Sequence, residues 1–149
     1  MSKLPRVGSF RDLMVYQKAR KLAQEIFKLT KAFPKEESYA LTDQVRRSSR
    51  SIGAQIAEAW AKRRYEKHFI SKLTDADGEQ QETQHWIDTA EDCGYLNTIM
   101  AQELRQKCAE IGRLLGGMLA KAESFIPDEP STLREGVIEY FVDSRPEDD

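Results

Sequence analysis

Histidine and cysteine are scarce in this 149-residue chain, which has two of each. A Ser/His/Asp or Cys/His catalytic arrangement, or a histidine-rich metal site, needs more of these residues in a suitable pattern. Cys93 and Cys108 do not form a Cys-x-x-Cys motif, so we expect free thiols in a reducing compartment. We therefore predict no enzyme activity, no cofactor and no bound metal.

Long apolar runs and glycine-rich phosphate loops are also missing. No stretch approaches the length of a membrane span, and the start Met1–Pro5 has no apolar segment of a signal peptide. The pair Gly116-Gly117 lacks the preceding strand and the Lys-Ser/Thr of a P-loop. We expect a cytoplasmic protein that has no membrane partner.

One short motif is typical of metal chemistry. Glu82-x-x-His85 resembles the ligand step of di-iron helical bundles, but those proteins need the step twice. The other histidine, His68, has no glutamate three residues before it, so we expect His85 to be a surface or subunit-contact residue. Glu58, Glu79 and Glu82 are candidate catalytic carboxylates, although pairing with arginines or hydroxyls explains them more simply.

Charge is unevenly distributed along the chain, whose formal net charge is −2. Residues 127–149 hold eight acidic and two basic residues, which leaves 21 bases and 17 acids, or +4, in residues 1–126. Such an asymmetry is a weak indication of a polyanionic partner. We divide the chain into a flexible lead-in (1–8), a helical body (9–126) and an acidic C-terminal extension (127–149).

Apolar residues in the body recur at steps of three and four, which predicts four helices. The first follows a capping box at Ser9 and Asp12 and ends near Ala32; the second starts at the cap Ser38 and ends near Arg64; the third follows Lys67 and ends at Gly94; the fourth starts at the cap Asn97. The expected core positions are Leu13, Tyr16, Ala19/Arg20, Ala23, Ile26/Phe27 and Thr30 in the first helix, Leu41, Val45, Ser48/Ser49, Ile52, Ile56 and Ala59/Trp60 in the second, Phe69, Leu73, Ala76, Gln80, Thr83, Ile87 and Ala90 in the third, and Leu104, Cys108, Ile111, Leu115, Met118, Ala122 and Phe125 in the fourth. Short connections favour an antiparallel up-down bundle.

Three features of these helices need explanation. The third helix has a polar core layer at Gln80 and Thr83, which requires hydrogen-bond partners. Gly112 and Gly116 weaken the fourth helix, either for a close backbone approach or for no packing reason. Beyond the bundle, the acidic extension contains the apolar cluster Val137-Ile138-x-Tyr140-Phe141-Val142, which is either disordered or docked on the body or on a neighbour.

The second helix has small or apolar residues on nearly all sides between Ile52 and Ala61, where only Gln55 and Glu58 are polar. A helix of this kind is buried on more than one side. One side then faces its own bundle and the other faces a partner. We predict an oligomer interface at Gly53, Ala54, Ala57, Glu58 and Ala61.

Basic residues flank this helix in two groups. The candidate nucleic-acid-binding residues are Arg46, Arg47 and Arg50 in the helix, and Lys62, Arg63, Arg64, Tyr65 and Lys67 at the corner that follows. Guanidinium groups suit the geometry of phosphates, and a tyrosine among them can stack on an unpaired base. The alternative is a solvated face, or salt bridges to a neighbouring subunit.

Several motifs carry a family resemblance. Ser51-Ile52-Gly53-Ala54-Gln55-Ile56-Ala57-Glu58-Ala59, preceded by Leu41-Thr42-x-Gln44-Val45-Arg46-Arg47-Ser48, resembles the signature of four-helix-bundle proteins encoded in intervening sequences of 23S ribosomal RNA. That family is related to the accessory variability determinant of diversity-generating retroelements. The segments Phe10–Ala19 and Gly94-Tyr95-Leu96 are similar too, so the likeness spans roughly Ser9 to Phe125. The chain departs from the family at Gly53, Gln55 and Ala59, where Pro, Asn and Gly are usual.

The resemblance implies an all-α four-helix bundle that assembles into a closed ring, a pentamer of identical subunits. It also implies a link to RNA or to a reverse transcriptase. We expect a non-enzymatic, oligomeric nucleic-acid-binding or accessory protein that acts as a scaffold for RNA or for a reverse transcriptase. Its expected partners are further copies of itself, RNA or DNA, and a reverse transcriptase. The alternative is a structural protein–protein adaptor whose basic groups serve only subunit contacts.

Overall fold

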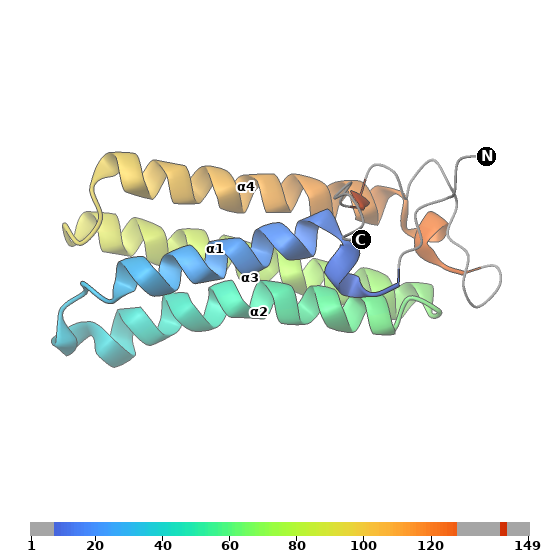
Figure 1. The fold of residues 1–149 in the computed structure, drawn as a ribbon, viewed down its shortest axis with the longest axis horizontal. Coiled ribbons are helices and arrows are strands. Elements are labelled where there is room, and N and C mark those ends of the chain that lie inside the picture. Colours follow the sequence, from blue (N-terminus) through green and yellow to red (C-terminus); the bar gives the residue numbers. More distant parts are fainter. Residues whose placement is uncertain (1–7, 128–140, 143–149) are drawn as a thin grey trace, which may run out of the picture.

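The computed structural model describes residues 8–127 together with 141–142. The four long helices are α1 (Met14–Thr30), α2 (Asp43–Ala61), α3 (Glu66–Asp92) and α4 (Thr98–Ala120). Consecutive helices run in opposite directions along a common axis (Figure 1). Each helix packs against two others in the cyclic order α1, α2, α3, α4, which confirms the predicted all-helical four-helix bundle. No helix in the described part of the chain is both long and apolar enough to cross a lipid bilayer.

The predicted capping box lies one turn before α1. The Asp12 carboxylate accepts hydrogen bonds from the backbone N–H groups of Gly8 and Ser9, at 2.9 and 3.1 Å. The Ser9 hydroxyl accepts one from the N–H of Arg11, at 3.0 Å. These bonds stabilise the 3-10 turn η1 (Phe10–Asp12) by satisfying N–H groups that have no partner within the turn. The α-helix itself then begins at Met14.

The buried face of the first helix agrees with the predicted one only in part: Leu13, Ala19, Ile26 and Thr30 are buried as predicted, whereas Tyr16 and Ala23 are half-buried. Its buried residues are Val15, Ala19, Leu22, Ile26 and Thr30. Arg20 is exposed, and Phe27 has 37 % of its surface exposed, so both predictions were wrong. The helix carries two neighbouring apolar stripes, and periodicity does not tell which of them faces the core. Tyr16 lies on the second stripe and packs over Gly53 of α2, where a Cβ would be 3.4 Å from its ring.

The connection from α1 to α2 is itself helical. It consists of the 3-10 turn η2 (Lys35–Glu37) and the π-helical turn η3 (Ser38–Thr42), which continues directly into α2. The prediction that Ser38 caps this helix was wrong, because its hydroxyl donates to the carbonyl oxygen of Lys35, at 2.7 Å. All the predicted core positions of the second helix are buried, from Leu41 to Trp60. The helix ends at Ala61, three residues before the predicted end.

The polar core layer of α3 has its hydrogen-bond partners. All seven predicted core positions of this helix are buried, Gln80 and Thr83 included. The Gln80 side chain donates to Asp77 and accepts from Gln84, at 2.9 and 2.8 Å. The Thr83 hydroxyl lies 2.9 Å from that of Ser48 on α2. The layer thus avoids the free-energy cost of burying polar groups without partners.

Both predicted signals at the α3–α4 connection are confirmed. Gly94 has a positive φ of 79°, and the Asn97 side chain accepts a hydrogen bond from the N–H of Met100, at 2.8 Å. The predicted core positions of the fourth helix are all buried, and the last two lie in the 3-10 turn η4 (Ala122–Phe125). Close packing explains Gly112, where a Cβ would lie 2.8 Å from the Gln80 amide nitrogen, but not Gly116, which has open space beside it.

Part of the apolar cluster in the acidic extension docks on the bundle. Phe141 is 2 % exposed, and its ring centroid lies 5.4 Å from that of Phe125. Val142 forms an isolated antiparallel bridge with Leu13. The other members of the predicted cluster, Val137, Ile138 and Tyr140, lie outside the described residues. Phe141 thus contacts the end of the helical body at Phe125, and Val142 contacts its beginning at Leu13.

Candidate nucleic-acid interface

The three arginines of α2 have different surroundings, although they lie within five residues of one another. Arg46 turns toward the end of α1, where its Nε donates to the Thr30 hydroxyl at 2.8 Å and its Nη2 to the Phe27 carbonyl oxygen at 3.4 Å. These bonds hold the end of α1 against the start of α2. Arg46 therefore has a structural role within the chain, whatever else it binds.

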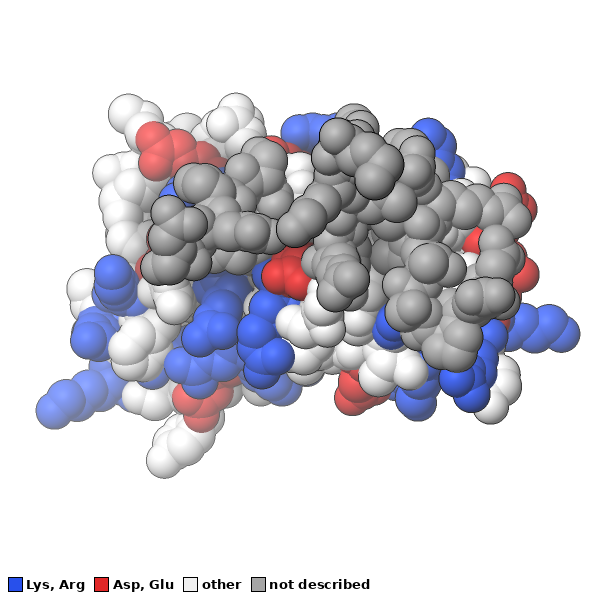
Figure 2. Space-filling model, turned by 45° about the vertical axis from the view of Figure 1, so that its right-hand side comes forward, with Lys and Arg blue, Asp and Glu red and all other residues white. Residues whose placement is uncertain are grey.

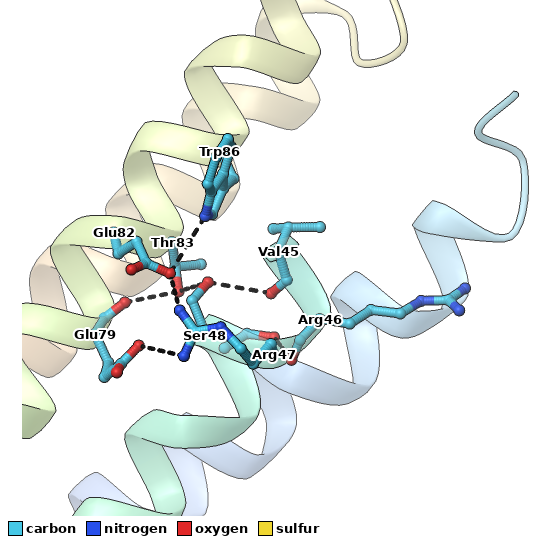
Figure 3. A network of polar contacts seen from close by, with 9 residues as sticks. Val45, Arg46, Arg47, Ser48, Glu79, Glu82, Thr83 and Trp86 are labelled. Carbon is cyan, nitrogen blue, oxygen red and sulfur yellow. Dashed lines mark hydrogen bonds and ion pairs between the residues drawn. The ribbon is translucent and has the colours of Figure 1, made fainter. Parts of the chain in front are cut away.

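Arg47 points to the opposite side of α2, toward α3. Its guanidinium forms an ion pair with Glu79 at 3.5 Å and a second one with Glu82. Glu82 also accepts a hydrogen bond from the Trp86 indole nitrogen, at 3.3 Å. Figure 3 shows this network beside the buried pair Ser48 and Thr83, with Arg46 directed away from it. Two carboxylates thus neutralise the charge of Arg47, which is a poor candidate for binding phosphate.

Arg50 differs from both, because it makes no hydrogen bond or ion pair within the described residues. It is exposed, and its guanidinium lies 5.4 Å from the centre of the Phe27 ring. Arg46 and Lys31 approach the same ring, at 4.7 and 4.9 Å. A cation over an exposed aromatic ring contributes about 0.5–1 kcal/mol. Three cations thus gather around one partly exposed aromatic side chain.

The corner between α2 and α3 presents a second basic group. Lys62, Arg64 and Lys67 are exposed, and their side chains make no hydrogen bond or ion pair with the described part of the chain. Tyr65 is 61 % exposed and lies edge-on to His68, with ring centroids 5.9 Å apart. The corner therefore offers three unpaired cations beside an accessible ring.

Arg63, the remaining basic residue of the corner, is held in place. Its guanidinium lies 4.1 Å from the centre of the Trp60 ring and donates to the Trp60 carbonyl oxygen at 2.8 Å. Burial lowers the pKa of Arg63 below its usual range, because an apolar environment disfavours the charged form. Its Nε is buried and has no hydrogen-bond partner among residues 8–127 and 141–142. Arg63 therefore supports the turn more than it serves the surface.

The predicted oligomer interface lies on both sides of α2. Gly53 is buried under Tyr16 within the same chain, so its contact is internal. Ala54 and Ala61 are exposed and Ala57 is half-buried, and together they form a smooth outer strip. Glu58 lies at the edge of that strip and pairs with Lys72 at 2.9 Å. The Lys72 ammonium lowers the pKa of Glu58, through a hydrogen bond first and through charge second.

Charge is segregated between the two halves of the bundle. Residues 14–64 hold 12 bases and five acids, a net charge of +7, whereas residues 65–127 hold six bases and 11 acids, a net charge of −5. Figure 2 shows lysine and arginine side chains lying together on one face of the molecule. A face of this kind raises the local concentration of polyanions. The sequence contains this difference, but the net charge of +4 for residues 1–126 averages the two halves and so does not reveal it.

Two residues of the site were not predicted as binding residues, Phe27 and Lys31. Phe27 was assigned to the core because of its apolar side chain, and Lys31 lies at the end of α1, outside both basic groups. The spacing of Arg46 and Arg50, one helical turn apart, is a signal for a shared neighbour, but it does not identify Phe27 as that neighbour.

Both residues of the Glu82-x-x-His85 step contact other side chains in this structure. Glu82 binds Arg47 and Trp86, while the exposed His85 packs against Trp86 with ring centroids 4.7 Å apart. Within residues 8–127 and 141–142 there is no group of three or more His, Cys, Asp or Glu side chains that could hold a metal ion. Glu79, another candidate carboxylate, contacts Arg47.

Comparisons with known proteins agree with this architecture. The sequence profile described as "23S rRNA-intervening sequence protein" matches residues 11–117. A solved structure of a protein of unknown function from the S23 ribosomal protein family of Bacteroides thetaiotaomicron is similar, with a TM-score of 0.65 and 29 % identity over 71 % of this chain and 95 % of that one. No curated protein is significantly similar in sequence. The profile match covers more than half of the residues, and the chain belongs to the family of 23S rRNA-intervening sequence proteins.

Proposed function

We propose that this protein is a non-enzymatic, oligomeric nucleic-acid-binding or accessory protein. The observation that carries the proposal is the concentration of unpaired cations at Arg50 of α2 and at the corner between α2 and α3, where Lys62, Arg64 and Lys67 lie near the exposed Tyr65. Exposed Lys and Arg side chains bind phosphates and release counterions, and an exposed aromatic ring stacks on bases. The net charge of +7 over residues 14–64 supports a polyanionic partner.

Assembly of several subunits strengthens this proposal. One subunit offers few unpaired cations, but a closed ring repeats them by symmetry, and linked weak contacts bind tightly through effective concentration. The exposed strip of Ala54, Ala57 and Ala61 on α2 gives a surface on which another copy can pack closely. The family resemblance supports a ring of five subunits, and RNA or a reverse transcriptase as the partner that the ring supports. The free thiols of Cys93 and Cys108 support a cytoplasmic location, where a reducing environment keeps them unpaired.

The second candidate function is a protein–protein adaptor. It is favoured by Arg46 and Arg47, which are tied to Thr30, Glu79 and Glu82 within the chain. If the remaining cations were likewise used in subunit contacts, the protein would hold other proteins together and bind no nucleic acid.

A binding assay on matched variants tests the proposal. Mobility shifts with single-stranded and duplex RNA and DNA at low salt are expected to show binding that is largely indifferent to sequence. The slope of log K against log salt should be about −0.7 to −0.9 per phosphate neutralised. Arg64→Glu with Lys67→Glu should weaken binding and flatten the slope. Arg113→Glu with Lys121→Glu on the α4 side changes the net charge equally and should have a much smaller effect.

Light scattering on every variant shows whether the assembly is preserved, so that weak binding is not confused with loss of the oligomer. If the assembled wild-type protein shifts none of these nucleic acids at low salt, the nucleic-acid proposal fails and the adaptor function replaces it. If both double variants weaken binding equally, the corner is not the binding surface.

A further inference from the structure

An open hollow of about 630 Å³ lies on the outer side of α1 and α2. The residues that line it are Phe27 of α1 and Asp43, Gln44, Arg46, Arg47, Arg50, Ser51 and Ala54 of α2. Asp43 is the only acidic residue among them, against three arginines. The hollow is therefore an electropositive depression that has an aromatic side chain in its wall.

Three cations surround Phe27: Arg46 and Arg50, which line the hollow, and Lys31, which contacts the ring from outside the lining residues. The Nζ of Lys31 and the guanidinium carbons of Arg46 and Arg50 lie 4.9, 4.7 and 5.4 Å from the centre of its ring. Cations gathered around one ring repel one another, and the attraction of each cation to the electron-rich face of the ring offsets part of that repulsion. An anion placed among them would offset the rest. The ring itself remains accessible, with 37 % of the side chain exposed.

Only some of these cations are available to a ligand. Arg47 is engaged by two glutamates of α3, and Arg46 is fixed by Thr30 and the carbonyl oxygen of Phe27. The side chains of Arg50 and Lys31 make no hydrogen bond or ion pair within the described residues. Arg46 thus serves to hold the wall of the hollow, and Arg50 and Lys31 are left to contact an anion.

We propose that this hollow binds one unpaired nucleotide of a single-stranded nucleic acid. Arg50 and Lys31 bind its phosphate, and its base packs against the exposed part of Phe27. An aromatic face together with arginine is the combination by which proteins hold unpaired bases, whereas a duplex keeps its bases stacked inside. This inference rests on the proposed function and adds to it the class of nucleic acid and the place where a base is held.

The hollow also lies within reach of the basic corner along one helix. Arg50 and Lys62 are 12 residues apart, which corresponds to about 18 Å along a helix axis. A short single strand spans such a distance, so one strand can contact both Arg50 in the hollow and the basic corner that follows α2. The strand would then be held by unpaired cations at its two ends and by a stacked base at one of them.

Fluorescence anisotropy tests this inference with two probes, a fluorescein-labelled oligouridylate and a labelled RNA hairpin with a fully paired stem and the same number of nucleotides. Arg50→Gln should weaken binding of the oligouridylate and reduce the salt slope by about 0.7, the value for one phosphate of a single strand. Arg113→Gln on α4 is the matched control: it removes the same charge from an exposed position outside the hollow and should leave the affinity nearly unchanged.

Changes at Phe27 separate stacking from charge. Phe27→Leu keeps an apolar side chain and should weaken oligouridylate binding about fivefold or more with the salt slope unchanged. Phe27→Trp, which keeps an aromatic face, should retain the affinity. Neither change should alter hairpin binding by more than about twofold. Circular dichroism and light scattering on each variant exclude misfolding or disassembly as the cause of a loss.

Different results overturn different conclusions. If wild-type protein binds neither probe, the proposed function fails and this inference fails with it. If wild type binds but Phe27→Leu behaves like wild type, or Arg50→Gln and Arg113→Gln weaken binding equally, the hollow is not a nucleotide site although the proposed function stands. If Arg50→Gln dissociates the oligomer, the hollow is covered by a second copy of the chain and the inference is wrong.

Discussion

The hydroxyl groups of Thr83 on α3 and Ser48 on α2 lie 2.9 Å apart and are completely buried. The Thr83 hydroxyl is also 2.8 Å from the carbonyl oxygen of Glu79, and that of Ser48 is 3.3 Å from the carbonyl oxygen of Val45. This pair joins the two helices by a polar contact at the level where Arg47 joins them on the surface (Figure 3). It fixes which turn of α3 faces which turn of α2.

The pair predicts a non-additive effect on stability. Thr83→Val keeps the shape of the side chain but leaves the Ser48 hydroxyl without this partner, so it should lower the free energy of unfolding by about 1–2 kcal/mol. Adding Ser48→Ala removes the second polar group and should lower it less than the sum of the single changes. Urea unfolding monitored by circular dichroism measures all three. Strict additivity would show that the two hydroxyls do not interact.

The two glycines of α4 predict opposite outcomes for the same substitution. Gly116→Ala places a methyl group in open space, and it should raise the free energy of unfolding by about 0.5–1 kcal/mol, because alanine is the better helix former. Gly112→Ala places a Cβ 2.8 Å from the Gln80 amide nitrogen. That amide must then move away from Asp77 and Gln84, which should cancel the gain. Equal stabilisation of both variants in thermal unfolding would contradict the packing at Gly112.

The two cysteines should differ sharply in reactivity. Burial raises the pKa of the Cys108 thiol to about 12, because the thiolate loses its hydration, whereas Cys93 is exposed. A thiol-specific chromogenic reagent at pH 8 should therefore modify one cysteine per chain quickly, and the second only after denaturation. Cys93→Ser should abolish the fast reaction. Rapid modification of both thiols in the native protein would contradict the burial of Cys108.

The same shift has a consequence for stability at high pH. The folded pKa of Cys108 is above the unfolded value of 9.0, so the folded state retains a proton that the unfolded state releases. The contribution of the Cys108 thiol to the free energy of unfolding is therefore complete below pH 9, and it declines as the pH rises from 9 to about 12.

Strict periodicity made the α3 and α4 cores predictable from sequence, because one unbroken 4-3 repeat allows a single buried face. Periodicity was only partly right in α1, because Leu22 and Phe27 lie on two neighbouring stripes and the register against α2 decides between them. The same limit applies to the candidate site. Arg47 and Arg50 look alike in the sequence, and only the position of Glu79 and Glu82 on the facing helix distinguishes an ion-paired arginine from an unpaired one.

The docked part of the C-terminal extension predicts that Phe141 contributes to stability. Its ring is 2 % exposed, lies against Phe125, and would be 3.0 Å from a Cβ at Gly117. Phe141→Ala should lower the free energy of unfolding by about 3 kcal/mol, as for other buried phenylalanines. Phe27→Ala is the matched control and should cost clearly less, because Phe27 is 37 % exposed. Similar losses in denaturant unfolding would contradict docking of Phe141.

The outer strip of α2 predicts the assembly. Ala54 and Ala61 are exposed and Ala57 is half-buried, so a glutamate at residue 57 or 61 reaches solvent in the isolated subunit and leaves the bundle intact. In an oligomer that packs on this strip, the same glutamate would be buried without a partner, which costs several kcal/mol. We therefore expect Ala57→Glu and Ala61→Glu to dissociate the wild-type oligomer while circular dichroism and thermal unfolding remain close to wild type. Gln106→Glu on the exposed side of α4 adds the same charge elsewhere and should not change the mass measured by light scattering. A monomeric wild-type protein at micromolar concentration would contradict the assembly itself, and an unchanged oligomer in both alanine variants would place the subunit contact elsewhere on the bundle.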